Sequence, residues 1–306
     1  MELMEKGEHA KHEGSLEAAQ LHFTEALTIR KELAKADPTN HTWLGDLSHS
    51  HISLGDLALK LLDLDAADRH YNESHSIREK LVATDPHNNE WRRYHSAVHG
   101  KKGDLALAKG ELKVADRQYG ELYEIATNLV KSDPDDLDNQ SILALGHYKM
   151  GNLAIARMDL EHATHHHGES RNIRQKLVAA DPGNTQWLLD FSDSHKKLGD
   201  IAMAKGERGG AILQYETGLM VREKLAESDS HNCSLRFDLL YFHDVIGMLR
   251  EQENEWAEAL AHYKTRLVLC EELEAMRPDD ESIQKDLRRS LAMIERVRMK
   301  LNSSDQ

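Results

Sequence analysis

Apolar residues recur at three- and four-residue spacing along almost the whole chain, which is the pattern of helices that bury one face. The apolar segments come in pairs separated by short polar turns. The first complete pair predicts a helix A over residues 41–60 and a helix B over residues 64–84. The turn between them falls near Leu62-Asp63, where two other copies carry Gly110-Glu111 and Gly206-Glu207. We therefore expect an all-α fold made of antiparallel helix hairpins.

A two-residue step, Asp-Pro in four of six copies, follows each helix B and repeats every 48 residues. It stands at Asp37-Pro38, Asp85-Pro86, Asp133-Pro134 and Asp181-Pro182, and it decays to Asp229-Ser230 and Arg277-Pro278. Proline cannot extend the preceding helix, and an Asn or Asp two residues later can cap the next one. These capping positions are Asn40, Asn88, Asp136, Asn184, Asn232 and Asp280.

The 48-residue spacing divides the chain into six repeats and a final helix. The repeats are about 1–37, 38–85, 86–133, 134–181, 182–229 and 230–277, and the capping helix is 280–301. In the capping helix Glu295 replaces the glycine found in every helix A, so no further helix B is expected to pack there. We expect one solenoid over residues 1–306. Helix A of the first repeat starts about two turns late. Two interpretations are open: the chain was cut from a longer protein, which we favour, or a partner covers this edge.

Small residues recur with the same period inside both helices. Helix A carries a glycine at Gly7, Gly55, Gly103, Gly151, Gly199 and Gly247, and helix B carries an alanine at Ala19, Ala67, Ala115, Ala163, Ala211 and Ala259. A glycine inside a helix costs about 1 kcal/mol relative to alanine, so its recurrence indicates a close approach of helix B. One turn after the alanine comes an aromatic ring that can fill the gap: Phe23, Tyr71, Tyr119, Tyr215 and Tyr263, with His167 in the fourth repeat.

The order Leu54-Gly55, Ala67 and Tyr71 resembles the tetratricopeptide repeat. The resemblance implies a right-handed α-solenoid, a superhelix of antiparallel hairpins whose concave groove is lined by helices A and binds a protein or peptide. The repeat here has 48 residues instead of the usual 34. The long unit with its Asp-Pro-x-Asn-x-x-Trp start, as at Asp37 to Trp43, is similar to repeats of bacterial multidomain proteins.

The resemblance assigns three kinds of side chain to the concave groove. The cationic and aromatic ones are Lys101, Lys149, Lys196, Lys197 and Tyr148, and the acidic or amide ones are Asp56, Asp104, Asn152 and Asp200. An apolar shelf consists of Leu59, Leu107, Ile155 and Met203. Two interpretations of the lysines are open: they meet the carboxylates of a bound peptide, or Lys101–Asp104 and Lys197–Asp200 are i, i+3 pairs that stabilise their helix by about 0.2–0.5 kcal/mol.

Composition narrows the class of function. The chain has 53 acidic and 39 basic residues and a net charge of −14, which disfavours a nucleic-acid or anionic-membrane partner. It has no apolar run near the ~20 residues of a membrane span, no signal peptide, and only two cysteines, so we expect a cytoplasmic protein. It has no glycine-rich phosphate loop, Gly-x-Ser-x-Gly elbow or His-Glu-x-x-His motif. We therefore expect a scaffold that is not an enzyme and needs no cofactor.

Histidine is the unusual component of the repeat. A column four residues before the glycine contains His51, His99, His147, His195 and His243. Equivalent atoms of stacked helices lie about 10 Å apart, whereas a zinc–nitrogen bond is about 2.1 Å, so this column predicts packing rather than chelation. His95/His99 and His162/His166 are i, i+4 pairs that can share a zinc ion, but their spacing marks no third ligand. We therefore expect no metal site. The alternative to a protein-interaction scaffold is a histidine-rich, metal-responsive binding protein.

Overall fold

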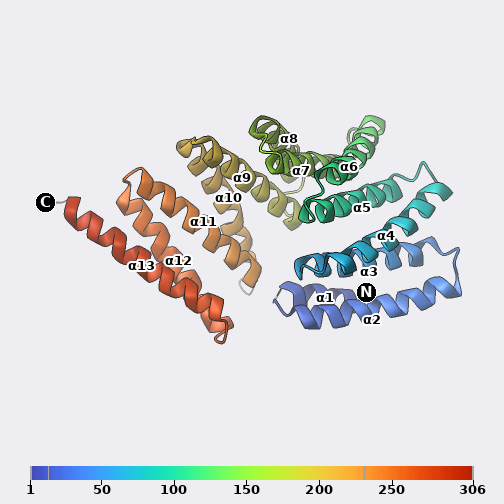
Figure 1. The fold of residues 1–306 in the computed structure, drawn as a ribbon, viewed down its shortest axis with the longest axis horizontal. Helices are drawn as coiled ribbons and strands as arrows, with labels where there is room; N and C mark the ends of the chain where they lie inside the picture. The colour runs from blue at the N-terminus through green and yellow to red at the C-terminus, as the bar shows by residue number, and fades with distance from the viewer. Residues whose placement is uncertain (1, 13, 230–231, 305–306) are drawn as a thin grey trace. The chain divides into compact units, whose positions relative to one another are not determined.

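The computed structural model describes residues 2–12, 14–229 and 232–304, and these residues form thirteen α-helices without a strand (Figure 1). The helices A are α1 (Glu2–His12), α3 (His41–Lys60), α5 (Asn89–Ala108), α7 (Leu137–Ala156), α9 (Thr185–Lys205) and α11 (Cys233–Gln252). The helices B are α2 (Leu16–Ala36), α4 (Leu64–Thr84), α6 (Leu112–Ser132), α8 (Leu160–Ala180), α10 (Arg208–Ser228) and α12 (Trp256–Met276), and α13 (Glu281–Ser304) follows. The expected all-α fold of alternating helices A and B is confirmed.

Two compact units divide the chain, residues 1–177 and residues 178–306, and the boundary falls in the last turn of α8. In the first unit, α1, α3 and α5 pack against their own helix B, and α3, α5 and α7 pack against the helix B before them. In the last hairpin of this unit, the His167 ring of α8 lies on Gly151 of α7. Helix α5 also contacts α3 and α7, the helices A on either side of it. Because the helices A of successive hairpins contact one another, they line the inner side of this unit. A single solenoid over the whole chain stays a prediction.

Caps and turns explain where the helices begin and end. The side chain of Asn40 accepts a hydrogen bond from the amide of Trp43 at 3.1 Å, which satisfies a free donor of the first turn. The same bond recurs at Asn88, Asp136, Asn184 and Asn232. Between helices A and B, one residue per repeat has a positive φ angle: Gly14, Leu62, Gly110, Met158, Gly206 and Asn254. The turn therefore keeps its backbone geometry even where its residue type changes.

The recurring glycine is required by an aromatic ring that lies directly on it. A Cβ atom added at Gly103 would lie 2.3 Å from Cε1 of Tyr119, and one at Gly55 would lie 2.5 Å from Cε1 of Tyr71. Each ring at this position is buried, including His167 of the fourth repeat, which covers Gly151. The packing predicted from the glycine, alanine and aromatic columns is thus confirmed.

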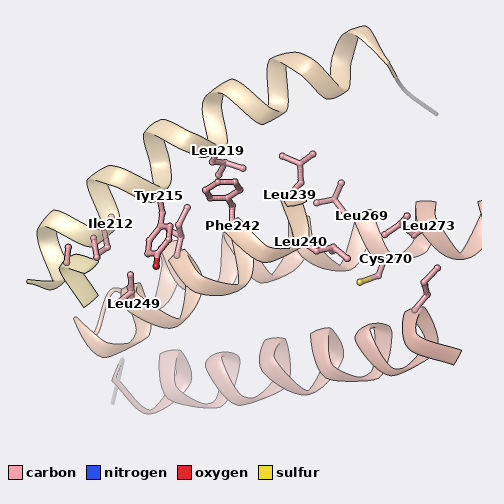
Figure 2. Packing of buried hydrophobic residues seen from close by; sticks show 14 residues of the cluster. Ile212, Tyr215, Leu219, Leu239, Leu240, Phe242, Leu249, Leu269, Cys270 and Leu273 are labelled. Atoms are coloured by element: carbon pink, nitrogen blue, oxygen red, sulfur yellow. The ribbon is translucent and has the colours of Figure 1, made fainter. Parts of the chain in front are cut away.

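The second unit has a continuous apolar core that runs from α9 to α13 (Figure 2). Tyr215 and Leu219 of α10 face Phe242 of α11, and Leu269 and Leu273 extend the core along α12 (Figure 2). On α13, Glu295 is exposed, whereas Ile294 and Val297 are buried against α12. Among the described residues, no helix is both long enough and apolar enough to span a membrane.

Candidate partner-binding surface

The expected groove lysines of the first unit form ion pairs between repeats. Nζ of Lys101 lies 2.7 Å from Oδ2 of Asp56 on the preceding helix A, and Nζ of Lys149 lies 2.6 Å from Oδ2 of Asp104. The i, i+3 pairing with Asp104 is one of the two interpretations that the sequence leaves open for Lys101; the register between repeats instead brings Asp56 into contact with this lysine. In the second unit, Lys197 does pair with Asp200 on its own helix, at 4.0 Å.

Buried tyrosines hold these aspartates from the other side. Oη of Tyr71 donates to Oδ1 of Asp56 at 2.8 Å, and Oη of Tyr119 donates to Asp104 at the same distance. In the second unit, Tyr215 and Tyr241 both donate to Asp200. Burial disfavours the Lys101 ammonium, but the Asp56 carboxylate outweighs this effect and raises the lysine pKa. A partner's carboxylate would have to displace an aspartate that is already fixed in place.

The other expected groove residues lie on helices A and also have internal contacts. In the first unit, the Tyr148 ring packs edge-to-face on His167 and lies under the guanidinium of Arg174, 4.8 Å from its carbon. In the second unit, Nζ of Lys196 lies 3.8 Å from the centre of the Tyr241 ring. Half-buried positions are held by Asn152 and by the shelf residues Leu59, Leu107 and Ile155 of the first unit and Met203 of the second.

Sequence reasoning missed a cavity of about 300 Å³ in the first unit, between α3, α4 and α5. It is lined by His41, Thr42, Gly45, Asp46, His49, Arg78, Glu90, Trp91 and Tyr94. One sequence signal could have indicated it. Gly45 stands where the other repeats carry larger side chains, namely Arg93, Ser141, Leu189 and Phe237.

A buried arginine forms part of the cavity wall. Arg78 is 7% exposed, and its Nε donates to Oγ of Ser48 at 2.8 Å, while Nη2 donates to the carbonyl oxygen of Gly45 at 3.0 Å. Its guanidinium carbon lies 4.5 Å from the centre of the Tyr94 ring. Burial lowers the pKa of Arg78, yet an arginine at this position stays charged at neutral pH. The cavity therefore contains a positive charge that has lost much of its hydration.

Two arginines at the equivalent position of other repeats bind carboxylates of this chain. Arg30 forms an ion pair with Asp46, and Arg222 forms ion pairs with Asp193 and Asp238. Residues 49 and 94 occupy the positions of Asp193 and Asp238 in the repeat of Arg78, and they are histidine and tyrosine. Among the residues that the structure describes, no carboxylate pairs with Arg78 within 4.0 Å. His49 and Tyr94 stand at the positions of these carboxylates, and both line the cavity.

No protein-family model matches the chain, and no curated protein matches its sequence. Among solved structures, BtubC (BKLC) from P. vanneervenii is 16% identical, with 87% of this chain and 94% of that chain covered and a TM-score of 0.62. RapI in its apo form is 10% identical over 98% of each chain, with a TM-score of 0.49. The thermophilic TPR protein TTC0263 of Thermus thermophilus is 16% identical over 80% of this chain and 99% of that chain, with a TM-score of 0.38.

At 16% identity, the likeness to BtubC shows that the two proteins share a helical-array fold, and it carries no information about activity. The hairpin geometry specifies that fold further, because a ring of helix B lies on a glycine of helix A in every repeat. The chain is therefore an array of tetratricopeptide-like repeats, with an unusually long repeat of 48 residues.

Proposed function

We propose that this protein is an interaction scaffold that binds a segment of a partner protein on the inner face of its helices A. The observation that carries the proposal is the cavity at Arg78, which opens among α3, α4 and α5. Hot spots of protein interfaces combine a well-packed pocket with aromatic and arginine side chains, and Arg78, Trp91 and Tyr94 supply these groups. The half-buried Leu59 and Leu107 offer apolar contact on the same two helices A.

The chemistry of the cavity favours an acidic side chain, or a C-terminal carboxylate, of the partner. Such a group would give Arg78 the ion pair that Arg30 and Arg222 form within the protein. A hydrogen bond between charged groups contributes about 1.5–3 kcal/mol when it is shielded from water. The net charge of −14 opposes an acidic partner at long range, so recognition has to come from this local contact. Added salt screens the repulsion, and binding should therefore not weaken as salt rises.

In this proposal the groove lysines have a different role from the cavity. Lys101 and Lys149 are paired with aspartates of the preceding repeat, so they hold successive repeats together. Substitution of both by alanine should lower stability more than it lowers affinity for the partner. Lys197, whose pair is longer, is the lysine most available for contact with a partner.

A displayed library of random peptides, selected on the immobilised chain, tests the proposal. We expect selected peptides to share an Asp, a Glu or a free C-terminus, and replacement of Asp by Asn should weaken binding by about tenfold or more. The variant Gly45→Leu fills the cavity; a Cβ at this position lies 3.6 Å from Nη1 of Arg78, an ordinary contact that the fold tolerates. It should abolish binding of the selected peptides.

Gly120→Leu is the matched control, because it makes the same substitution on helix B α6, where an added Cβ meets nothing within 4 Å. It should leave the affinity unchanged. Equal affinity of the selected peptides for wild type and Gly45→Leu would contradict the assignment of the cavity. Equal loss in Gly45→Leu and Gly120→Leu would show a general effect on folding, which circular dichroism of both variants would reveal.

A further inference from the structure

Three histidine rings from two repeats meet in the first unit. His75 belongs to α4, and His95 and His99 are one turn apart on α5. One nitrogen atom of each ring lies within 4.8 Å of the corresponding atoms of the other two. The ring centres are 4.8–5.0 Å apart in all three pairs. The i, i+4 pair seen in the sequence thus gains the third ligand that its own helix does not provide.

The separation of the nitrogen atoms is close to that of a metal site. Nitrogen ligands about 2.1 Å from a tetrahedral ion lie roughly 3.4 Å from one another. The nitrogen atoms therefore need to approach by up to about 1.4 Å, which rotations about the side-chain bonds can supply. His99 is buried and the other two rings are half-buried, so a fourth position can be taken by water.

A hydrogen bond prepares the His99 ring to act as a ligand, and the His95 ring has a free nitrogen. Nδ1 of His99 lies 2.9 Å from Oε1 of Gln118, which can only accept, so Nδ1 carries the proton and Nε2 keeps its lone pair. Nε2 of His95 is buried and has no hydrogen-bond partner among the described residues. Burial first, and then repulsion from His99 and His75, lowers the pKa of His95 to about 4, so the ring is neutral at pH 7.

The other repeats show that packing alone does not require these histidines. At the position of His95 they carry Leu47, Leu143, Phe191 and Leu239. At the position of His75 they carry Leu27, Tyr123, Arg171, Leu219 and Leu267. An apolar side chain would fill this space without leaving a buried nitrogen unsatisfied. The unsatisfied nitrogen of His95 carries a cost that a bound ligand would remove.

We propose that His75, His95 and His99 bind one divalent transition-metal ion, with zinc as the best match. Three neutral imidazoles and an open position suit borderline cations such as Zn²⁺, Ni²⁺ and Cu²⁺, whereas Mg²⁺ and Ca²⁺ require oxygen ligands. Lys102 and Arg78 disfavour positive charge near the rings, and Glu79 favours it. The expected dissociation constant is therefore micromolar, weaker than that of a structural zinc site. The bound ion would join α4 to α5, two of the helices that line the Arg78 cavity.

Calorimetric titration of the purified chain with zinc chloride tests the site. Wild type should bind one ion saturably with a dissociation constant below ~10 μM, and zinc should raise its melting temperature. The variants His75→Leu and His95→Leu, which carry the residue of other repeats, should lose this binding and the rise in melting temperature. Gln118→Leu should weaken binding by about 10–100-fold, the usual effect of removing a partner of a ligand. Cobalt in place of zinc should give the visible absorption of a tetrahedral site in wild type alone.

His162→Gln is the matched control, since His162 and His166 form an i, i+4 pair of the same spacing on α8, and His162 is exposed. It should leave zinc binding unchanged. Absence of saturable binding in wild type would overturn the proposal. Binding that survives in both leucine variants and disappears in His162→Gln would also overturn it, because the ion would then be bound at the histidine-rich segment of α8.

Discussion

At the scale of single residues, the turn between helices A and B makes a strict demand on the backbone. Its residue has a φ angle of 60° to 81° in all six repeats, a conformation that glycine adopts without strain and other residues adopt at a cost of about 1 kcal/mol or more. Three repeats have glycine there, whereas the others have Leu62, Met158 and Asn254. The side chains of Leu62 and Met158 are 78% and 88% exposed, so little packing energy compensates the strain.

Met158→Gly should therefore stabilise the protein, by about 0.5–1 kcal/mol once the greater flexibility of glycine in the unfolded chain is included. Chemical denaturation of wild type and variant would measure the change. Gly110→Ala, at the same position of another repeat, should destabilise by a similar amount. A lower stability of Met158→Gly would mean that the exposed methionine makes a contact that the turn depends on.

A glycine in the helix interior is required for a different reason, because there is no room for a side chain, whereas its φ angle is an ordinary helical one. At Gly103 an added methyl group would overlap the Tyr119 ring, which is fully buried and cannot move aside. We expect Gly103→Ala to cost on the order of 1–3 kcal/mol, even though alanine favours a helix by about 1 kcal/mol. Gly120→Ala, on α6 in open space, isolates that propensity effect and should be neutral or stabilising. Thermal unfolding of the two variants should shift in opposite directions, and a parallel shift would contradict the packing argument.

At the scale of elements, the sequence predicts the contacts within each hairpin well and the contacts between neighbouring hairpins much less well. Helix bounds, caps and the contact of Gly55 with Tyr71 follow from local spacing, because all their atoms belong to one repeat. The pairing of Lys101 with Asp56, and of His75 with His95, depends on the offset between repeats. That offset is set by how side chains of different repeats interlock, and the period alone does not determine it.

The Lys149–Asp104 ion pair gives a direct measure of coupling between successive repeats. Its side chains are 16% and 24% exposed, and Tyr119 holds the aspartate. We expect a double-mutant cycle of Lys149→Met and Asp104→Asn to give a coupling energy of about 1 kcal/mol or more. The same cycle on Lys197 and Asp200, which are more exposed and 4.0 Å apart on one helix, should give about 0.3–0.5 kcal/mol. Equal coupling in the two cycles would argue against a special role of the pair between repeats.

At the scale of the whole molecule, a single hydrogen bond between helix A and helix B recurs in both units. The histidine column uses it, with Nδ1 atoms of two rings 3.0 Å apart in the pair of His51 with His70. The pairs of His147 with His166 and of His243 with His262 are alike, and in the third and fifth repeats Gln118 and Gln214 accept the bond. One ring of each histidine pair must donate while the other accepts, so the accepting ring cannot gain a proton at Nδ1 without losing the bond. Because these histidines pack between helices A and B, we expect the stability of the folded protein to depend on pH.

Burial, followed by the charge of the partner ring, lowers the pKa of His51, His147 and His243 to about 4. Since an unfolded histidine titrates near 6.5, the unfolded chain binds more protons between pH 6.5 and pH 4. The contribution of these histidines to the free energy of unfolding is thus fully present above pH 6.5. It is lost as the pH drops toward 4, by on the order of 2–3 kcal/mol for each histidine over the whole window.

Nearby charges modify this effect without reversing it. Lys31 opposes protonation of His51, whereas Glu169 near His147 and Glu223, 3.9 Å from Nε2 of His243, favour protonation of their histidines. Urea unfolding at pH 7.5 and pH 5 should show a clearly lower midpoint at pH 5. Replacing His70, His166 and His262 with glutamine gives these repeats the pair already present at His99 and His195, and it should reduce the difference, because an amide carries no charge. An equal midpoint at both pH values would mean that the paired rings accept protons in the folded protein as readily as in the unfolded chain.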